Sequence, residues 1–159
     1  MKREEYLFGT LRILMGWIFL WAFLDKLFGL GFATTSDKSW LLGNSPTSGF
    51  LSFGTHGPFA FIFQSLAGNA FVDWIFMIGL LLIGVALILG VTKRLSCYGG
   101  MIMLLFMWLA ALPPENNPVI DEHIIYGFVL IFLAHLKTAF SLEGWWNSLS
   151  VVKRGRWLK

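Results

Sequence analysis

The sequence contains little that supports thiol, metal or haem chemistry. Cys97 is the only cysteine in 159 residues, which excludes an intrachain disulfide, a Cys-x-x-Cys redox pair and a multi-thiolate metal site. No His-Glu-x-x-His run is present, and of the histidines only His56, in a loop, and His123 are expected on one side of a membrane. Haem held by two histidines needs them on facing helices, so neither haem nor a metal is expected as a cofactor.

Charged residues are also scarce. They make up 13% of the chain, against 57% hydrophobic residues and a mean hydropathy of +0.70, whereas soluble domains carry about 25% charged residues. This composition predicts an integral membrane protein. The net charge of +3 does not indicate nucleic-acid binding, because the basic residues flank apolar runs, where orientation in a membrane explains them.

Long apolar runs dominate the sequence. They predict membrane-spanning helices at about residues 8–32, 72–91, 97–112 and 123–140, because the hydrocarbon core of a bilayer takes about 20 mostly apolar helical residues. Four such helices leave no room for a soluble catalytic domain. The predicted fold is therefore all-α, a four-transmembrane-helix bundle in a single membrane domain, 1–159.

The distribution of lysine and arginine predicts the orientation. Ten of the twelve lie at the N terminus, within 92–96 or beyond residue 136, and only Lys26 and Lys38 lie on the other side. Cytoplasmic segments are enriched in these residues, so both termini of this multi-pass protein are expected in the cytoplasm, at the cell membrane. Cys97 is then expected to react with impermeant thiol reagents only from the inner face.

Two segments outside the predicted spans are themselves apolar. Residues 34–71 form an extracytoplasmic segment, in which Pro58 opens a short helix expected to lie in the outer interface or over the mouth of the bundle. Whether this segment is a lid or a surface anchor stays open. Residues 141–159 combine tryptophans with cations and predict an amphipathic cytoplasmic tail at the lipid surface.

The first span carries Asp25 and Lys26, and ionisable groups inside a span are costly enough to be functional candidates. Helical spacing places five residues on one inward-facing stripe: Arg12, Gly16, Phe19, Phe23 and Lys26. Asp25 lies about 100° further round the helix, so Lys26 is expected to pair with Asp73, Asp121 or Glu122. The alternative is that Lys26 extends to the membrane surface while Asp25 caps the chain locally.

Small residues predict where the helices pack. Gly127 and Ala134 share one face of the fourth span, which is expected to pack on the stripe of the first span that contains Gly16. Glycines of the middle spans, Gly84 and Gly99 among them, are interpreted as packing residues rather than as ligand contacts.

The polar residues near the outer ends of the spans are the candidate site. They are Asp25, Lys26, Asp73, Asp121, Glu122 and His123. Acids, a cation and an imidazole in a low dielectric suit proton transfer, so the candidate catalytic residues are Asp25, Lys26, Asp73 and His123. Trp21, Trp40 and Trp74 with His123 are predicted to line an apolar pocket for a flat ring such as a quinone. The alternative is that acids in first helical turns merely favour the helix dipole.

Three stretches resemble a known family. LRILMGWIFLWAFLDKLFGLGF, VDWIFMIGLLLIGVALILG and LPPENNPVIDEHIIYG are similar to the DoxX family, in particular to its branch resembling DoxD, the membrane subunit of thiosulfate:quinone oxidoreductase. The resemblance extends over about residues 7–146. It implies a four-helix membrane protein that works with a second subunit, with thiosulfate as electron donor and membrane quinone as acceptor. It supplies no catalytic residues.

Three functions follow as hypotheses. The first is a membrane subunit of a quinone-linked oxidoreductase that takes electrons from a sulfur compound, with a partner subunit supplying the anion site, because the outer side carries two cations against six acids. The second is a non-catalytic anchor or assembly partner of a redox or stress-defence complex. The third is a small transporter. Whether the chain is itself an enzyme and whether it forms a homo-oligomer stay open.

Overall fold

The computed structural model describes residues 2–149 and 152, and the described part is all-helical, without strands. The α-helices are α1 (Arg3–Phe28), α2 (Ala60–Gln64), α3 (Ala70–Leu89), α4 (Lys93–Ala110), α5 (Glu122–His135) and α6 (Glu143–Ser148). Four short helical turns lie between α1 and α2: η1 (Ser36–Lys38), η2 (Trp40–Leu42), η3 (Phe50–Gly54) and η4 (Gly57–Phe59). The predicted all-α fold is confirmed, and two helices, α1 and α3, are long and apolar enough to cross a membrane.

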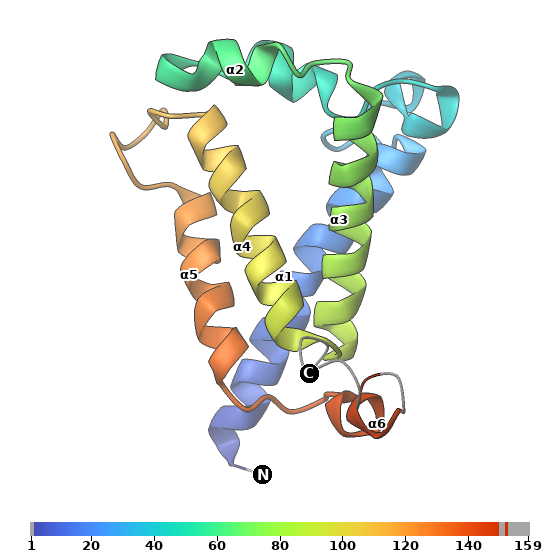
Figure 1. Ribbon diagram of the computed structural model, residues 1–159, viewed down its shortest axis with the longest axis vertical. Coiled ribbons are helices and arrows are strands. Elements are labelled where there is room, and N and C mark those ends of the chain that lie inside the picture. The colour runs from blue at the N-terminus through green and yellow to red at the C-terminus, as the bar shows by residue number, and fades with distance from the viewer. Residues whose placement is uncertain (1, 150–151, 153–159) are drawn as a thin grey trace.

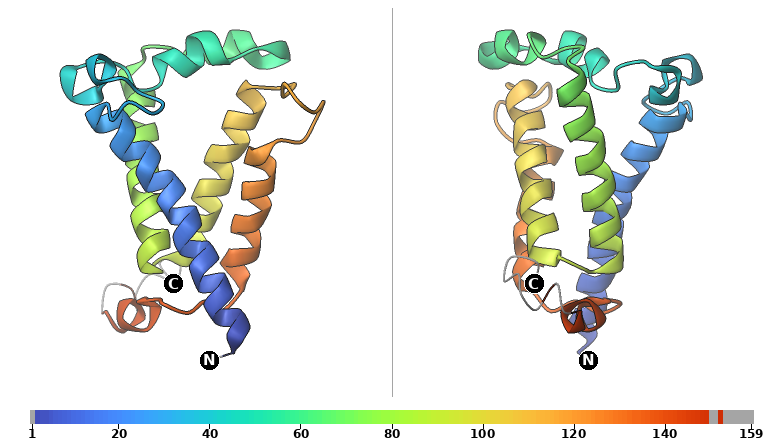
Figure 2. Two further views of the ribbon diagram at one scale, coloured as in Figure 1. Left: turned by 180° about the vertical axis from the view of Figure 1, so that it is seen from behind. Right: turned by 45° about the vertical axis from the view of Figure 1, so that its right-hand side comes forward.

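The four long helices form two antiparallel pairs. α1 packs along α3, and α4 packs along α5 (Figure 1). We call the end that carries α2 the outer end, and the end with the start of α1 and with α6 the inner end. α1 and the α4–α5 pair lie close together at the inner end and diverge toward the outer end, where α2 lies across the end of α4 (Figure 2).

The helix ends explain two differences from the predicted spans. α1 ends at Phe28 and not at residue 32, because Gly29 adopts the left-handed conformation, with φ 67°, and its N–H closes the helix on the Asp25 carbonyl. α5 ends at His135 and not at residue 140. There the backbone turns extended and makes tertiary hydrogen bonds instead: Lys93 Nζ donates to the Leu136 carbonyl at 2.7 Å.

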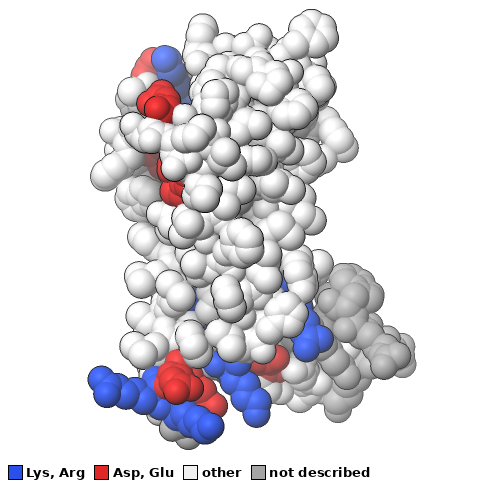
Figure 3. Space-filling view, turned by 90° about the vertical axis from the view of Figure 1, so that its left-hand side faces the viewer, with Lys and Arg blue, Asp and Glu red and all other residues white. Residues whose placement is uncertain are grey.

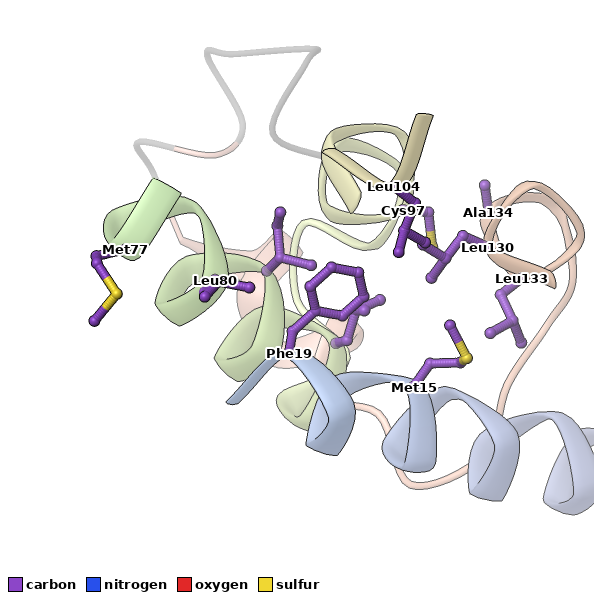
Figure 4. Close-up of a cluster of buried hydrophobic side chains, with 11 residues drawn as sticks. Met15, Phe19, Met77, Leu80, Cys97, Leu104, Leu130, Leu133 and Ala134 are labelled. Carbon is purple, nitrogen blue, oxygen red and sulfur yellow. The ribbon is translucent and has the colours of Figure 1, made fainter. Parts of the chain in front are cut away.

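The core lies where both helix pairs meet. Met15 and Phe19 of α1, Leu80 of α3, Leu104 of α4 and Leu130 of α5 are buried side by side (Figure 4). The buried part of the predicted stripe on α1, from Arg12 through Phe19, faces this core as expected. Apolar packing of this kind holds the two pairs together.

Glycines bring α1 and α3 into backbone contact, which corrects the predicted helix partners. A Cβ on Gly16 would lie 2.9 Å from the Gly84 carbonyl oxygen of α3, and one on Gly84 would lie 2.7 Å from the backbone nitrogen of Leu20. Gly127 of α5, in contrast, faces α4, with Met101 nearest. The expectation that the fourth span packs on the Gly16 stripe is therefore wrong, because the backbones approach most closely at Gly16 and Gly84.

This contact predicts that two similar glycine substitutions differ in their effect on the free energy of unfolding. Gly84→Ala is expected to lower the free energy of unfolding by about 1–3 kcal/mol, since the new methyl group must push α1 away from α3. Gly99→Ala, on α4, meets only Ile83 side-chain atoms at 3.8 Å and is expected to be neutral or stabilising by up to about 1 kcal/mol. Unfolding in mixed detergent micelles measures both, and equal effects would contradict the close α1–α3 contact.

The surface separates charged ends from an uncharged belt. In Figure 3 the lysine, arginine, aspartate and glutamate side chains gather toward the two ends of the molecule, with most of the basic ones at the inner end. Large apolar side chains are exposed on all four long helices: Leu14 and Ile18 on α1, Ile75 and Leu82 on α3, Ile102 and Phe106 on α4, Phe128 and Phe132 on α5. Cys97 is fully buried, so the expected labelling of this thiol from the inner face does not apply.

Part of the predicted cytoplasmic tail lies within the described residues. α6 is a short helix with Trp145 exposed. The segment before it is tied to the end of α3, because Ser141 Oγ donates to the Gly90 carbonyl at 2.8 Å and the Leu142 N–H donates to the Leu89 carbonyl at 2.9 Å. The cations predicted at 153–156 lie outside the described residues.

Candidate functional site

Asp25 lies in the last turn of α1 and folds the chain that follows. Its carboxylate accepts hydrogen bonds from the backbone N–H groups of Phe32, at 3.2 Å, and Ala33, at 2.9 Å. Only 2% of the residue is exposed. A buried carboxylate needs such donors, and these come from the loop leaving α1. The alternative of local capping therefore holds for Asp25.

Lys26 has no ion pair with Asp73, Asp121 or Glu122 among residues 2–149. The predicted pairing is wrong, because Asp73 and Asp121 are held by their own hydrogen-bonding partners, described below. Lys26 is half-buried beside the uncharged belt, which leaves the alternative that its ammonium extends to the membrane surface.

Asp73 anchors the outer segment to α3. Its Oδ1 accepts hydrogen bonds from the hydroxyls of Thr47, at 2.5 Å, and Ser45, at 2.8 Å, and from the Thr47 N–H at 3.3 Å. The residue is 5% exposed. It thus fixes the turn at 45–47 against the first turn of α3, a structural role that the sequence pattern did not reveal because the donors lie 26 and 28 residues away.

His123 and Asp121 form the outer pair with the chemistry of an acid–base site. His123 Nδ1 lies 2.8 Å from Asp121 Oδ2, with side-chain exposures of 18% and 10%. Asp121 also caps α5 by accepting from the Ile124 N–H at 3.2 Å. When the carboxylate accepts the Nδ1 proton, the ring orientation is set and Nε2 is left to exchange a proton with a ligand.

The three predicted ring residues lie in two clusters. Trp40 and Trp74 pack edge to face with ring centroids 4.7 Å apart. Trp21 packs instead on Trp17, at 5.7 Å, and on Phe32, at 5.1 Å. No hydrogen bond, ion pair or ring contact within the described chain joins either cluster to His123, which lies on the other helix pair. The structure thus brings Asp73 and Trp74 onto one helix and leaves His123 apart from them.

The outer segment closes over the end of α4. The short helix predicted after Pro58 is confirmed as η4 and α2, and it lies across the outer end (Figure 1). His56 holds it there, since its N–H donates to the Ala110 carbonyl at 3.2 Å and its Nε2 donates to the Pro113 carbonyl at 2.8 Å. Its outward side chains Phe53 and Phe61 are 91% and 84% exposed, so the segment offers an apolar surface to an interface.

Arg12, which periodicity places on the inward-facing stripe of α1, has a role at the inner end of the molecule that the sequence pattern did not predict. It is 0% exposed, and its guanidinium bonds only to carbonyl oxygens: Nη1 donates to Leu87 and Ile88 at the end of α3, and Nη2 donates to Ala139 and Phe140 after α5. The last carbonyls of a helix carry partial negative charge, so they replace a carboxylate as its partner. An arginine inside an apolar run was the available signal.

No group of three metal-ligating side chains occurs in the part of the chain that the structure describes. Compared with known protein families, with curated proteins and with solved structures, the chain finds no match. The resemblance to the DoxX family therefore stays a prediction.

Proposed function

We propose that the protein spans a bilayer with α1, α3, α4 and α5, has its inner end in the cytoplasm, and is the membrane subunit of a quinone-linked oxidoreductase. The observation that carries the membrane part is the uncharged belt between charged ends (Figure 3). A helix bundle in which all four long helices expose large apolar side chains is unstable in water and stable in lipid. The basic inner end favours the cytoplasmic side.

Helix lengths support four spans of unequal depth. At 1.5 Å rise per residue, α3 with 20 residues is about 30 Å long, α4 with 18 about 27 Å, and α5 with 14 about 21 Å. The hydrocarbon core is about 30 Å thick. α5 is short, but residues 136–140 continue toward the inner end. The carbonyls of Leu136, Ala139 and Phe140 accept hydrogen bonds from Lys93 and Arg12, so these groups of the non-helical backbone are satisfied by protein.

Introduced cysteines test the orientation. In a Cys97→Ala background, Ser36→Cys at the outer end is expected to react with an impermeant maleimide in intact cells. Ser148→Cys at the inner end is expected to react only after permeabilisation. Both positions are exposed, and each is the control for the other. Labelling of residue 148 but not 36 in intact cells would contradict the proposed orientation.

The redox part of the proposal is supported by the His123–Asp121 pair and by the resemblance in sequence. Reduction of a quinone consumes two electrons, here from the donor through a partner subunit, and two protons, which its oxygens must receive. A half-buried imidazole oriented by a carboxylate is suited to deliver them. Purified protein in native-like lipid is expected to retain quinone, measured by solvent extraction and chromatography.

A second candidate is a non-catalytic anchor or assembly partner. It is favoured by Asp25 and Asp73, whose carboxylates serve the fold and are closed to a ligand. Under this alternative a partner protein still co-purifies, but no quinone is retained and thiosulfate-dependent quinone reduction does not depend on His123. Co-purification together with quinone content separates the two functions.

A further inference from the structure

A crevice of about 570 Å³ opens at the inner end of the molecule, between the start of α4 and the end of α5. Its lining is rich in ionisable side chains: Glu5, Lys93, Arg94, His135, Lys137 and Glu143. It lies at the opposite end of the helices from His123, so it is separate from the proposed quinone site. Four of these six residues are lysine, arginine or histidine.

The hydrogen bonds show which of these charges are free. Lys93 is used by the fold, since its Nζ donates to the Leu136 carbonyl at 2.7 Å and lies 3.8 Å from a Glu143 carboxylate oxygen. His135 is used as well: Nδ1 lies 2.9 Å from the Ile131 carbonyl oxygen and Nε2 lies 3.2 Å from the Tyr98 hydroxyl. The imidazole and the ammonium are therefore occupied.

Two cations remain without a counter-ion. Arg94 and Lys137 are exposed, and neither side chain has a hydrogen bond or ion pair with any residue in the described ranges. Arg94 stands in the first turn of α4, where the helix dipole is positive and Thr92 supplies no side-chain cap. The lining contains two carboxylates. Glu143 lies 3.8 Å from Lys93 Nζ, which leaves Glu5, whose carboxylate accepts a hydrogen bond from the Lys2 N–H at 3.2 Å, to oppose Arg94 and Lys137. The balance favours an anion.

Exposed apolar side chains of α4 and α5 lie next to residues that line the crevice, since the Tyr98 hydroxyl is 3.2 Å from His135 Nε2. Leu95, Tyr98 and Phe132 lie within one or two turns of Arg94 and His135, and all three are exposed. We propose that the crevice binds the phosphate group of an anionic phospholipid of the cytoplasmic leaflet, with an acyl chain along α4 and α5. Basic pockets at the cytoplasmic ends of membrane helices suit such headgroups. The proposal rests on the membrane orientation given above and is independent of the quinone site.

Lipid binding to the purified protein in an uncharged detergent tests this proposal. Phosphatidylglycerol is expected to bind more tightly than phosphatidylcholine, as measured by native mass spectrometry. Arg94→Gln and Lys137→Gln are each expected to weaken phosphatidylglycerol binding about fivefold, since one basic residue near a charged membrane surface contributes about 1 kcal/mol. Arg3→Gln is the matched control, because Arg3 is exposed at the same end but outside the crevice.

Glu5→Gln is expected to have the opposite effect on phosphatidylglycerol binding. Removing the opposing carboxylate is expected to strengthen phosphatidylglycerol binding severalfold, a gain that misfolding cannot produce. Equal weakening by Arg3→Gln and Arg94→Gln, or no gain with Glu5→Gln, would overturn the site. Binding of glycerol phosphate as tight as that of the lipid would overturn the lipid as its ligand. Recovery of the chain in the soluble fraction of broken cells would instead contradict the membrane assignment.

Discussion

Replacing Arg12 by methionine is expected to lower the free energy of unfolding by about 3–5 kcal/mol. Methionine keeps the apolar volume but leaves the carbonyls of Leu87, Ile88, Ala139 and Phe140 without their donor in a buried region. These carbonyls belong to the end of α3 and to the segment after α5. The substitution therefore removes the hydrogen bonds that join α1 to both of these segments. Denaturation in mixed detergent micelles measures the effect.

Two further variants test whether the Arg12 guanidinium itself is responsible for the effect. Arg12→Lys keeps the charge, but an ammonium cannot form the planar double fork that reaches four carbonyls, so an intermediate loss is expected. Arg3→Met removes an exposed arginine of the same helix and is expected to change stability by less than about 0.5 kcal/mol. If Arg12→Met were as mild as Arg3→Met, the guanidinium would not be holding the inner end together.

Under the proposed quinone-linked function, replacing His123 by glutamine is expected to slow thiosulfate-dependent quinone reduction about 100-fold or more, in membranes that contain the chain and the proposed partner subunit. Positioned acid–base groups contribute about 10²–10⁴ to a rate. Glutamine keeps polarity and length but cannot carry a proton to a quinone oxygen. The measurement is the rate of quinone reduction with a short-chain quinone.

His135→Gln is the matched control for this prediction. His135 lies at the other end of α5 and is bonded to Tyr98 and to the Ile131 carbonyl. Its replacement is expected to leave the rate of quinone reduction unchanged. If His123→Gln and His135→Gln both behave as the native chain does, the quinone site at the outer end is refuted. The anchor function then becomes the better account.

The charged residues of the first span show what a sequence pattern can and cannot predict. The sequence pattern predicts both Asp25 and Lys26, charged residues in an apolar run, as site candidates. In the structure the loop after Gly29 folds back and places two N–H groups on the Asp25 carboxylate, which gives this residue a structural role. No spacing rule predicts that return, since it depends on the left-handed turn at Gly29 and on the packing of 30–35 beside α1.

The burial and the hydrogen-bonding partners of Asp73 and Arg12 could be identified only from the tertiary structure. Asp73 was identified as an acid in a first helical turn, but its donors come from the segment at 45–47, far away in sequence. Arg12 was placed on the inward face of its helix by periodicity. Its importance depends on carbonyls 75 to 128 residues away, which only the packing of α1 between two chain ends brings within reach.

The amino-acid pattern was sufficient to predict the helical class, the approximate place of each long helix, the short helix after Pro58 and the basic inner end. These follow from hydrophobicity, helix propensity and charge, which add up locally along the chain. Three features depend on contacts between distant segments: Gly16 packs on α3, α5 ends at His135, and His123 pairs with Asp121 away from the tryptophans. Helix partners and hydrogen-bond partners depend on shape and donor geometry between distant segments, and a local pattern carries no information about them.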